Sequence, residues 1–564
     1  MSFSTAKYIY PSSKWWAVFS GGIVNNTPNT HLADHFSPYG RNFRISGASI
    51  INRPWHQTFA TLSGSLYPKG IGSYLRSSSA NDVMVIRQTV DSTHKLVTLT
   101  TGGTQTSIDT ASIITAETRM NFVNIGDLIF CMDGTTIWQL SGTTFTDIKT
   151  SSGLAGLSLN APKFWVTWAN CHWVGWFATS WQTVRKSVVD DPDNFSGSGS
   201  QSLLFPENVT GLGTANTTLF TFTKNTINAT TAQDVQDNGT NLTFDSKSIQ
   251  ATEGAICHGS IVSVGNELYY LSSSNKICKI ARWANIYGFE VVELSDLQYK
   301  GISTFMNTLD SDQSDSFAQY YPEQNLIKWF LKSKGSTILD TCVIYDTESE
   351  QFIFDTNKYF YDAVYFYGQV YSISGITPTV FRDEYLNTDD WSGIDFEYWT
   401  KAFDEWEATL KKWYWESRTD VSFSELASLT QETWINSRVD EVWNYEGTLT
   451  DSITVDNTSI EVSSGWLWSE PIGEFPIGEE GYDPFNTYNL TILRTKGNLN
   501  VRGYSIQYRF TNSAPGSSIR LKRLGYKREV LSGLTTDLTL AACAFLCTEL
   551  LATLITESGN SLIL

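Results

Sequence analysis

The chain has 564 residues, more than a single hydrophobic core organises, so we expect roughly two to four domains. Its 41% hydrophobic and 17% charged residues are typical of a globular protein and argue against a disordered chain. The formal net charge of −19 argues against sequence-specific nucleic-acid binding through a broad basic face, although an acidic channel wall would let DNA slide past without sticking.

The residue types favour strands and turns. Aromatic residues make up 14% of the chain, Ser, Thr, Asn and Gly are abundant, and long runs of Ala, Leu, Glu and Lys are nearly absent. Aromatic and β-branched residues favour strands, while Gly and Asn favour turns. The sequence therefore predicts a mainly β protein.

The seven cysteines are scattered, none forms a Cys-x-x-Cys pair, and the six histidines do not cluster with them. A zinc site needs such ligands at close spacing, so the sequence predicts no metal site and no cofactor. The first residues lack the basic-then-apolar pattern of a signal peptide, so we expect the protein to be assembled in a cytoplasm. Its thiols are then expected to be reduced.

Residues 1–75 are predicted to form an N-terminal arm and a first strand rather than a domain with its own core. Turn residues interrupt this stretch at Ser20-Gly21-Gly22, at residues 25–28 and at residues 37–40. Strand-like segments follow at residues 42–45 and 50–55.

Residues 76–387 are predicted to form a β-propeller-like domain. Strand–turn–strand units recur along this stretch, at residues 121–140, 163–176, 261–280, 326–355 and 362–381. Turn dipeptides such as Asp133-Gly134 separate the strands, because tight hairpins need residues that adopt positive φ. Units that recur every 40–50 residues or so are typical of propeller blades. A pair of β-sandwiches is the alternative.

Residues 388–530 are predicted to form a separate C-terminal β-rich domain. Residues 391–417 combine aromatic and charged side chains, and a short helix at residues 402–412 is an alternative to strands there. Residues 504–510 alternate clearly, with Tyr504, Ile506, Tyr508 and Phe510 on one face of a strand.

Residues 531–564 are predicted to form a C-terminal arm that completes its apolar contacts on a neighbouring subunit. The apolar run at residues 538–555 has borderline length for a membrane span, but Glu549 lies inside it. A buried or interface-covered segment is therefore expected, rather than stable membrane insertion.

No group of residues has the spacing of a catalytic site, so the chain is predicted not to be an enzyme. Residues 133–138 are similar to the Asp box of sialidase-like propellers, but Asp133 and Gly134 are adjacent where that box separates them. No carboxylate pair stands out for glycoside hydrolysis. Residues 190–195 and 310–315 are expected to be surface turns, with calcium binding as the weaker alternative, and Ser198 lies in no nucleophile elbow.

A basic island interrupts the acidic chain. Residues 501–530 hold seven cations against Glu529 alone, namely Arg502, Arg509, Arg520, Lys522, Arg523, Lys527 and Arg528. We expect either a solvated strand face or a surface that docks to an acidic partner, and contact with DNA ranks third.

Several short motifs resemble those of the tail hub or nozzle proteins (tail tubular protein B-like) of short-tailed bacteriophages. The matching segments are Gly21-Gly22-Ile23, residues 29–39, Arg41-Asn42, Ser46-Gly47 and Arg53-Pro54-Trp55, where Trp55 replaces the more usual Gly or Pro. Residues 190–195 resemble an Asp-Pro-x-x-aromatic turn of such propellers, and residues 503–510 resemble their C-terminal strand.

The resemblance implies a structural virion protein without catalytic residues or a cofactor. Subunits of that family form a homohexameric ring around the DNA-ejection channel, with the portal and adaptor on one side and fibres or spikes attached outside. Double-stranded DNA would pass through the ring during genome delivery. The residues expected at subunit interfaces are Gly21, Gly22, Ile23, Arg53, Trp55 and the basic island.

The alternative function is a tail protein that binds or cleaves host-surface glycans. Exposed Trp and Tyr side chains would then stack on sugar rings. Most of the tryptophans lie in apolar strand patterns, as Trp165, Trp168, Trp173 and Trp176 do, which favours a role in the core.

Overall fold

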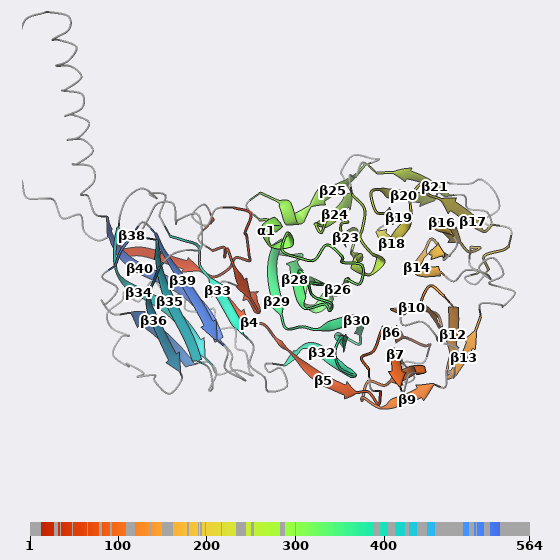
Figure 1. Cartoon of the computed structure of the whole chain (residues 1–564), viewed down its shortest axis with the longest axis horizontal. Helices are drawn as coiled ribbons and strands as arrows, with labels where there is room; N and C mark the ends of the chain where they lie inside the picture. The colour runs from red at the N-terminus through yellow and green to blue at the C-terminus, as the bar shows by residue number, and fades with distance from the viewer. Residues whose placement is uncertain are drawn as a thin grey trace, which may run out of the picture.

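The computed structural model contains two β-structured bodies that lie side by side (Figure 1). One is a propeller of seven four-stranded sheets, and the other is a sandwich of two larger sheets. The residues that the structure describes are 13–27, 32–33, 35–47, 49–64, 66–77, 82–90, 93–108, 119–135, 137–148, 162–177, 180–189, 191, 194–197, 199–215, 217–232, 244–249, 253–282, 288–298, 300–386, 395–403, 412–423, 428–436, 448–456, 489–495, 501–503, 505–512 and 519–530.

Each blade of the propeller is an antiparallel sheet, and the first six blades take their four strands consecutively from the chain. The first blade contains β6 (Ile71–Tyr74), β7 (Val83–Val90), β8 (Thr93–Leu99) and β9 (Gln105–Ile108). The second contains β10 (Asn121–Ile125), β11 (Leu128–Met132), β12 (Ile137–Ser141) and β13 (Thr144–Asp147). The third contains β14 (Pro162–Trp168), β15 (Cys171–Phe177), β16 (Ser180–Lys186) and β17 (Gln201–Leu204).

The remaining blades continue this order. The fourth contains β18 (Val209–Ala215), β19 (Thr218–Thr223), β20 (Ile227–Ala232) and β21 (Phe244–Ser248). The fifth contains β22 (Val262–Val264), β23 (Glu267–Leu271), β24 (Ile277–Arg282) and β25 (Phe289–Glu293). The sixth contains β26 (Phe317–Tyr321), β27 (Leu326–Leu331), β28 (Thr341–Asp346) and β29 (Gln351–Thr356). The seventh contains β30 (Phe360–Phe366), β31 (Gln369–Ser374), β32 (Thr379–Leu386) and β5 (Trp55–Thr61).

The early strand β5 closes the propeller. It pairs antiparallel with β32, so chain that precedes the first blade completes the seventh. The innermost strands contact one another in a ring that runs from β6 through β10, β14, β18, β22, β26 and β30 and back to β6. This closure ties the two ends of the propeller together.

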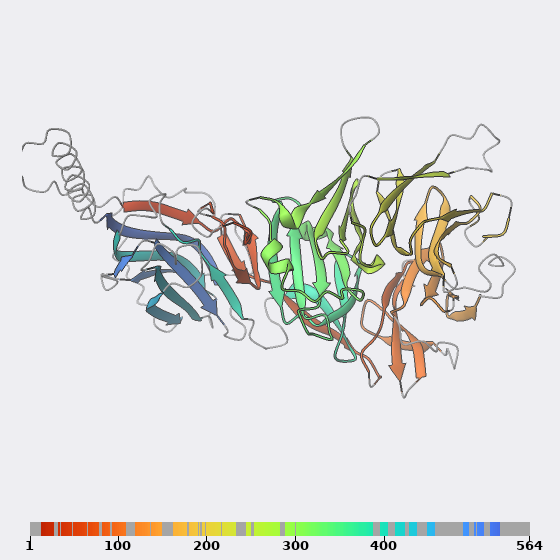
Figure 2. The same ribbon diagram turned by 45° about the horizontal axis from the view of Figure 1, so that its top comes forward.

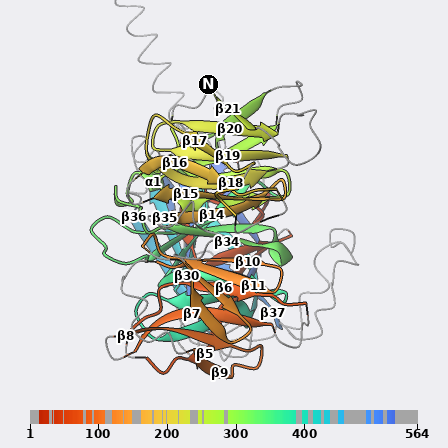
Figure 3. The ribbon, with the colours of Figure 1, turned by 90° about the vertical axis from the view of Figure 1, so that its right-hand side faces the viewer.

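Apolar side chains fill the spaces between neighbouring blades, whose sheets follow one another in Figure 3. Phe130 of the second blade and Trp165 of the third stack with ring centroids 5.0 Å apart. Because each blade is covered on both faces, its strands are apolar on both sides, as β23 shows with four consecutive buried residues. Glycines with positive φ make the tight turns between strands, for example Gly126 (55°) and Gly368 (74°).

The second body combines the start of the described chain with its end. One sheet holds β3 (Phe43–Ser46), β4 (Ser49–Asn52), β40 (Ile519–Val530), β34 (Lys412–Phe423) and β37 (Asn489–Thr495), with β1 (Ser13–Val18) on β40 and β38 (Val501–Gly503) on β34. The other holds β2 (Gly40–Arg41), β33 (Phe396–Trp399), β39 (Ser505–Asn512), β35 (Ser428–Asn436) and β36 (Thr448–Asp456). Figure 2 shows the two sheets as layers of one sandwich.

The two sheets share one interior. Ile506, Tyr508 and Phe510 of β39 are fully buried, and they lie in the same apolar cluster as Tyr414 and Leu521 of the facing sheet. Hydrogen bonds also cross between the layers, since Gln431 Nε2 donates to Ser417 Oγ at 3.2 Å. The propeller is therefore an insertion between β4 and β33 of the sandwich.

Helical elements in the described residues are short. They are the 3₁₀ turns η4 (His258–Ser260), η5 (Leu294–Asp296) and η6 (Pro322–Gln324) and the single-turn helix α1 (Ser303–Met306). Within that part of the chain, no helix has the length and apolar character needed to cross a membrane. Residues 531–564 and most of the possible helix at 402–412 lie outside the described residues.

The mainly β class, with a propeller core and an additional C-terminal β domain, is confirmed. The predicted boundary at residue 75 is wrong, because the described strands before it belong to both bodies. Strands β1 to β4 belong to the sandwich, while β5 and β6 belong to the propeller. The C-terminal domain likewise extends beyond 388–530, since β40 needs β1 and β4 as hydrogen-bonding neighbours.

Candidate functional site

The two bodies meet at a buried region that we call the junction. It contains the Gly21-Gly22-Ile23 segment, Asn42 and Arg53, and a cluster of six charged residues, Arg44, Lys328, Asp355, Lys358, Asp383 and Glu384. Apolar contacts continue through it, because one core cluster includes Phe43 of the sandwich and Phe354 of the propeller.

Asn42 fastens the sandwich to β29 of the propeller. Its side-chain amide donates to Thr356 Oγ1 at 3.0 Å and to the Asp395 carbonyl at 2.8 Å, while its Oδ1 accepts from the Thr356 N–H at 2.9 Å. Its backbone N–H donates to the Phe354 carbonyl at 2.7 Å, and Arg53 Nε donates to its Oδ1 at 3.1 Å. The φ of Asn42 is +59°, a left-handed conformation that Asn adopts more readily than most residues.

The Gly-Gly-Ile segment packs directly on the same strand. Ile23 N–H donates to the Phe352 carbonyl at 2.8 Å, and Gly22 N–H donates to Gln351 Oε1 at 2.5 Å. A Cβ on Gly22 would lie 2.5 Å from the Phe352 carbonyl oxygen, so only glycine allows this approach. Ile23 itself is 1% exposed.

The ionic cluster holds three cations and three carboxylates whose side chains are at most 8% exposed. They come from the sandwich and from two blades of the propeller. Arg44 lies in β3 of the sandwich. In the sixth blade Lys328 lies in β27 and Asp355 in β29, with Lys358 in the loop after it, and in the seventh blade Asp383 and Glu384 lie in β32.

Arg44 is the contribution of the sandwich to this cluster. Its guanidinium binds Asp355 in a bidentate manner, with N–O distances of 2.9 and 2.7 Å, and it also pairs with Glu384. Planar, two-point contacts of this kind are the strongest ion pairs available to a side chain. One sandwich residue is thereby bound to both the sixth and the seventh blade.

Two lysines bind the carboxylates from the propeller side. Lys328 Nζ lies 3.0 Å from Asp383 Oδ2, and Lys358 Nζ lies 2.7 Å from Asp383 Oδ1. Tyr321 donates its hydroxyl to Asp383 at 2.7 Å. Glu384 has a φ of +56° at an irregularity in β32, and it contacts both lysines. Consecutive strand residues normally point to opposite faces, and the irregularity lets Asp383 and Glu384 serve the same cluster.

The cations keep the carboxylates charged. Burial alone raises the pKa of Glu384, but the positive charges of Arg44, Lys328 and Lys358 outweigh burial and lower that pKa to about 2. The same balance holds the pKa of Asp383 well below its usual range. A cluster with equal numbers of both charges is compatible with burial, whereas removing one partner leaves an uncompensated charge.

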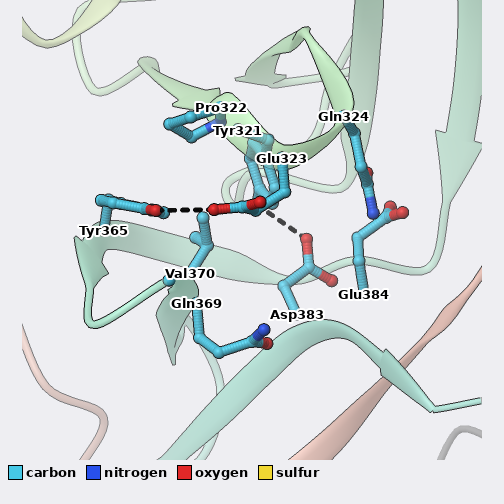
Figure 4. Close-up of a pocket in the computed structure, with 10 residues that line it drawn as sticks. Tyr321, Pro322, Glu323, Gln324, Tyr365, Gln369, Val370, Asp383 and Glu384 are labelled. Carbon is cyan, nitrogen blue, oxygen red and sulfur yellow. Dashed lines mark hydrogen bonds between the residues drawn. The ribbon is translucent and has the colours of Figure 1, made fainter.

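A small cavity beside the cluster is shown in Figure 4. Its walls include Tyr321, Glu323, Tyr365, Asp383 and Glu384, and its volume is about 40 Å³. Tyr365 donates to Glu323 at 3.0 Å across its outer side. The space admits water but no organic ligand. The cluster therefore acts as a structural clamp.

The structure corrects the interpretation of the N-terminal interface residues. Gly21, Gly22, Ile23 and Arg53 are buried inside the chain, so they cannot form an exposed contact with a neighbouring subunit. Gly22 and Ile23 bond to β29, Arg53 bonds to Asn42, and Gly21 lies against His35 and Phe36. The backbone of Trp55 pairs with Leu386 in the seventh blade.

The basic island is divided among three strands of the sandwich. Arg509 of β39 is paired within the chain, to Glu397 at 2.8 Å and Glu432 at 3.1 Å, so docking to a partner through it is not supported. Arg520 in β40 is partly buried. The other members lie in described strands with side chains outside the described part: Arg502 in β38, and Lys522, Arg523, Lys527 and Arg528 in β40.

The acidic segments form local turns. Asp133 Oδ1 accepts from the Thr135 N–H at 2.8 Å, and Asp310 Oδ1 accepts from the Asp312 N–H at 2.8 Å. Asn194 accepts from the Gly197 N–H at 2.8 Å. Among the described residues, no group of three or more His, Cys, Asp or Glu is placed to hold a metal ion. Ser198 lies outside them.

The residues of the ionic cluster were not predicted from the sequence. They are separated by up to 340 positions, and no spacing rule joins them. The available signal was a charged residue at the end of an apolar strand, as at Asp355 after Phe354 or Asp383 two residues after Phe381. That pattern marks single positions and does not reveal their partners.

Comparison with known proteins gives no family. No protein-family model and no curated protein matches the sequence. Among solved structures, the crystal structure of BBS1N in complex with ARL6DN, soaked with mercury, has 8% sequence identity and a TM-score of 0.35, over 59% of this chain and 96% of that chain. This similarity is too low to indicate a relationship, and the propeller and sandwich are assigned from the strand pairing described above.

Proposed function

We propose that the chain is a structural subunit of a ring in the tail of a short-tailed bacteriophage, the nozzle or hub around the DNA-ejection channel. In this proposal the protein performs no catalytic step. Six copies surround an axis, contact adaptor or portal on one side and carry fibres or spikes outside, and double-stranded DNA passes through during genome delivery.

One observation carries the proposal. The motifs that resemble nozzle proteins, Gly21-Gly22-Ile23, Arg41-Asn42 and Arg53-Pro54, gather at the junction although they are spread along the first part of the chain. Residues that fix two bodies in one orientation are what a ring subunit needs, because small changes in that angle accumulate around a closed ring.

The net charge of −19 is compatible with this role. Acidic walls repel DNA phosphates, so DNA would move through the ring without being held. The ring would be assembled in the host cytoplasm and would remain in the virion.

Light scattering on the purified full chain tests the proposal. The expected result is a species of about six times the 63.2 kDa chain mass, formed alone or on addition of the adaptor protein. The variant Lys527→Glu in the basic island should weaken that assembly, while Lys300→Glu, at an exposed residue that pairs with Glu350, should leave it intact. A chain that stays monomeric or trimeric under both conditions and degrades capsular polysaccharide would overturn the proposal.

A further inference from the structure

A second, larger cavity lies at one end of the propeller axis. Its volume is about 590 Å³, and its lining includes residues near the start of all seven innermost strands. Examples are Lys69 before β6, Arg119 before β10, Lys163 in β14, Asp315 before β26 and Tyr361 in β30. A concave site of this size suits a small molecule.

Cations predominate in this cavity. Among the described residues that line it, Lys69, Arg119, Lys163 and Lys332 are cations and Asp315 is a carboxylate. That carboxylate pairs with Lys332 at 2.9 Å. The excess of positive charge among these residues contrasts with the net charge of −19 of the whole chain, so the cavity favours anions although the chain is acidic.

Lys163 and Arg119 are held in place at the wall. Arg119 donates to the carbonyls of Ser316 and Tyr361, and its guanidinium lies 4.7 Å from the centre of the Tyr361 ring. Lys163 Nζ lies 5.2 Å from the Trp176 ring centre and has no ion-pair partner among the described residues. Burial lowers the pKa of Lys163 although Asp315 acts to raise it, so an anion bound beside Lys163 would further stabilise its positive charge.

Two stacked tryptophans line the cavity beside Lys163. The rings of Trp176 and Trp181 are parallel within 1°, with centroids 6.0 Å apart, and Trp181 is 47% exposed. Trp176 has a φ of +60°, which is unusual for a bulky residue and costs on the order of 1–3 kcal/mol. Strained residues of this kind are retained where they position a side chain for function.

We propose that this cavity binds an acidic saccharide, with its carboxylate on Lys163 and Arg119 and the apolar face of a sugar ring on Trp181. The space accommodates one or two rings. A long polyanion such as single-stranded nucleic acid is the less favoured ligand, because it would extend beyond the cavity over a chain whose net charge is −19. This binding does not depend on the proposed ring function.

Calorimetric titration of the full chain with digalacturonic acid tests the proposal. We expect saturable binding that is at least tenfold weaker for the dimethyl ester, which keeps both rings and removes both charges. Adenosine monophosphate and inorganic phosphate should bind more weakly than the acid. No binding of the acid, equal binding of the ester, or tighter binding of either phosphate compound would overturn the proposal.

Variants separate the site from the fold. Trp181→Ala and Lys163→Met should each weaken binding of digalacturonic acid at least tenfold, and Trp181→Ala should leave the melting temperature unchanged because the ring is half exposed. The matched controls are Tyr367→Ala, which removes another half-exposed ring, and Lys300→Met; neither residue lines the cavity. An unchanged affinity of Trp181→Ala for digalacturonic acid would contradict the proposed stacking. That result would not bear on whether the chain forms the proposed ring.

Discussion

The junction and the axial cavity both place charged side chains in partly or fully buried surroundings, but they balance charge differently. In the junction three cations face three carboxylates at ion-pair distance. In the part of the cavity that the structure describes, four cations and one carboxylate line the wall. In a balanced cluster the charges compensate one another within the chain, whereas an excess of positive charge favours binding of an anion. The charge balance therefore favours a structural role for the junction and ligand binding for the cavity.

The largest effect is expected at the junction. Lys358→Met removes a fully buried cation that contacts all three carboxylates. The free energy of unfolding should fall by about 3–5 kcal/mol, because an uncompensated buried charge remains. Urea denaturation measures it.

The control for that experiment is Lys300→Met. Lys300 is exposed and pairs only at the surface with Glu350, so the change should be within about 0.5 kcal/mol. If Lys358→Met and Lys300→Met changed the free energy of unfolding equally, the buried ionic cluster would stabilise the chain no more than a surface ion pair does.

Asn42→Ala should destabilise the chain by about 3 kcal/mol, because it loses several buried hydrogen bonds and forces Ala into a left-handed conformation. Asn42→Gly removes the same hydrogen bonds but tolerates the backbone, so its loss should be smaller. Urea denaturation of both variants gives the comparison. If Gly and Ala were equally destabilising, the backbone conformation of Asn42 would have no part in the effect.

Parts of this architecture are local in the sequence and parts are not. The strand–turn–strand units at residues 121–140, 261–280 and 362–381 were predicted because turn residues and apolar strands are neighbours. The closure of the propeller by β5 and the pairing of β1 and β4 with β40 join distant segments, for which no local pattern exists.

The sites show the same limit. Gly22 and Ile23 were singled out from motifs, but their hydrogen bonds are to β29, 329 residues later in the case of Gly22. The cavity was not predicted at all, because each innermost strand contributes only one or a few of its residues. Trp176 was assigned to the core from its apolar strand, and it packs against a core cluster of the third and fourth blades while also lining the cavity.

Acidification should destabilise the chain in two steps. Burial lowers the pKa of His172 and of His258 to about 4, below the ordinary 6.5. The unfolded chain binds these protons first, so stability should fall as the pH drops from 6.5 to 4. Glu384, with its pKa lowered from 4.5 to about 2, should add a further loss between those values.

The variant His172→Gln isolates the first step. It should reduce the loss between pH 6.5 and 4 by about 2 kcal/mol, measured as thermal or urea stability across that range. Trp165 Nε1 donates to His172 Nδ1 at 2.6 Å, which requires the neutral ring. An unchanged pH profile in the variant would show that His172 titrates normally in the folded chain.

The smallest effect concerns the cavity. Because the pKa of Lys163 is lowered, its positive charge is lost at a lower pH than usual, and affinity for digalacturonic acid should fall about tenfold on raising the pH from 7 to 10, roughly 1.4 kcal/mol. The other titratable groups that line this cavity are Tyr67, Lys69, Arg119, Cys257, His258, Asp315, Lys332 and Tyr361. Lys163→Arg keeps the charge throughout and should flatten the profile. If the affinity of Lys163→Arg for digalacturonic acid fell equally between pH 7 and 10, the loss would be due to titration of a group other than Lys163.

Electron microscopy of the purified full chain tests the proposed function most directly. We expect closed six-fold rings in which each copy contributes one seven-bladed propeller and one sandwich in a fixed relative orientation. Single particles that remain isolated at high protein concentration and with the adaptor protein present, or whose two bodies vary in their relative orientation, would contradict it.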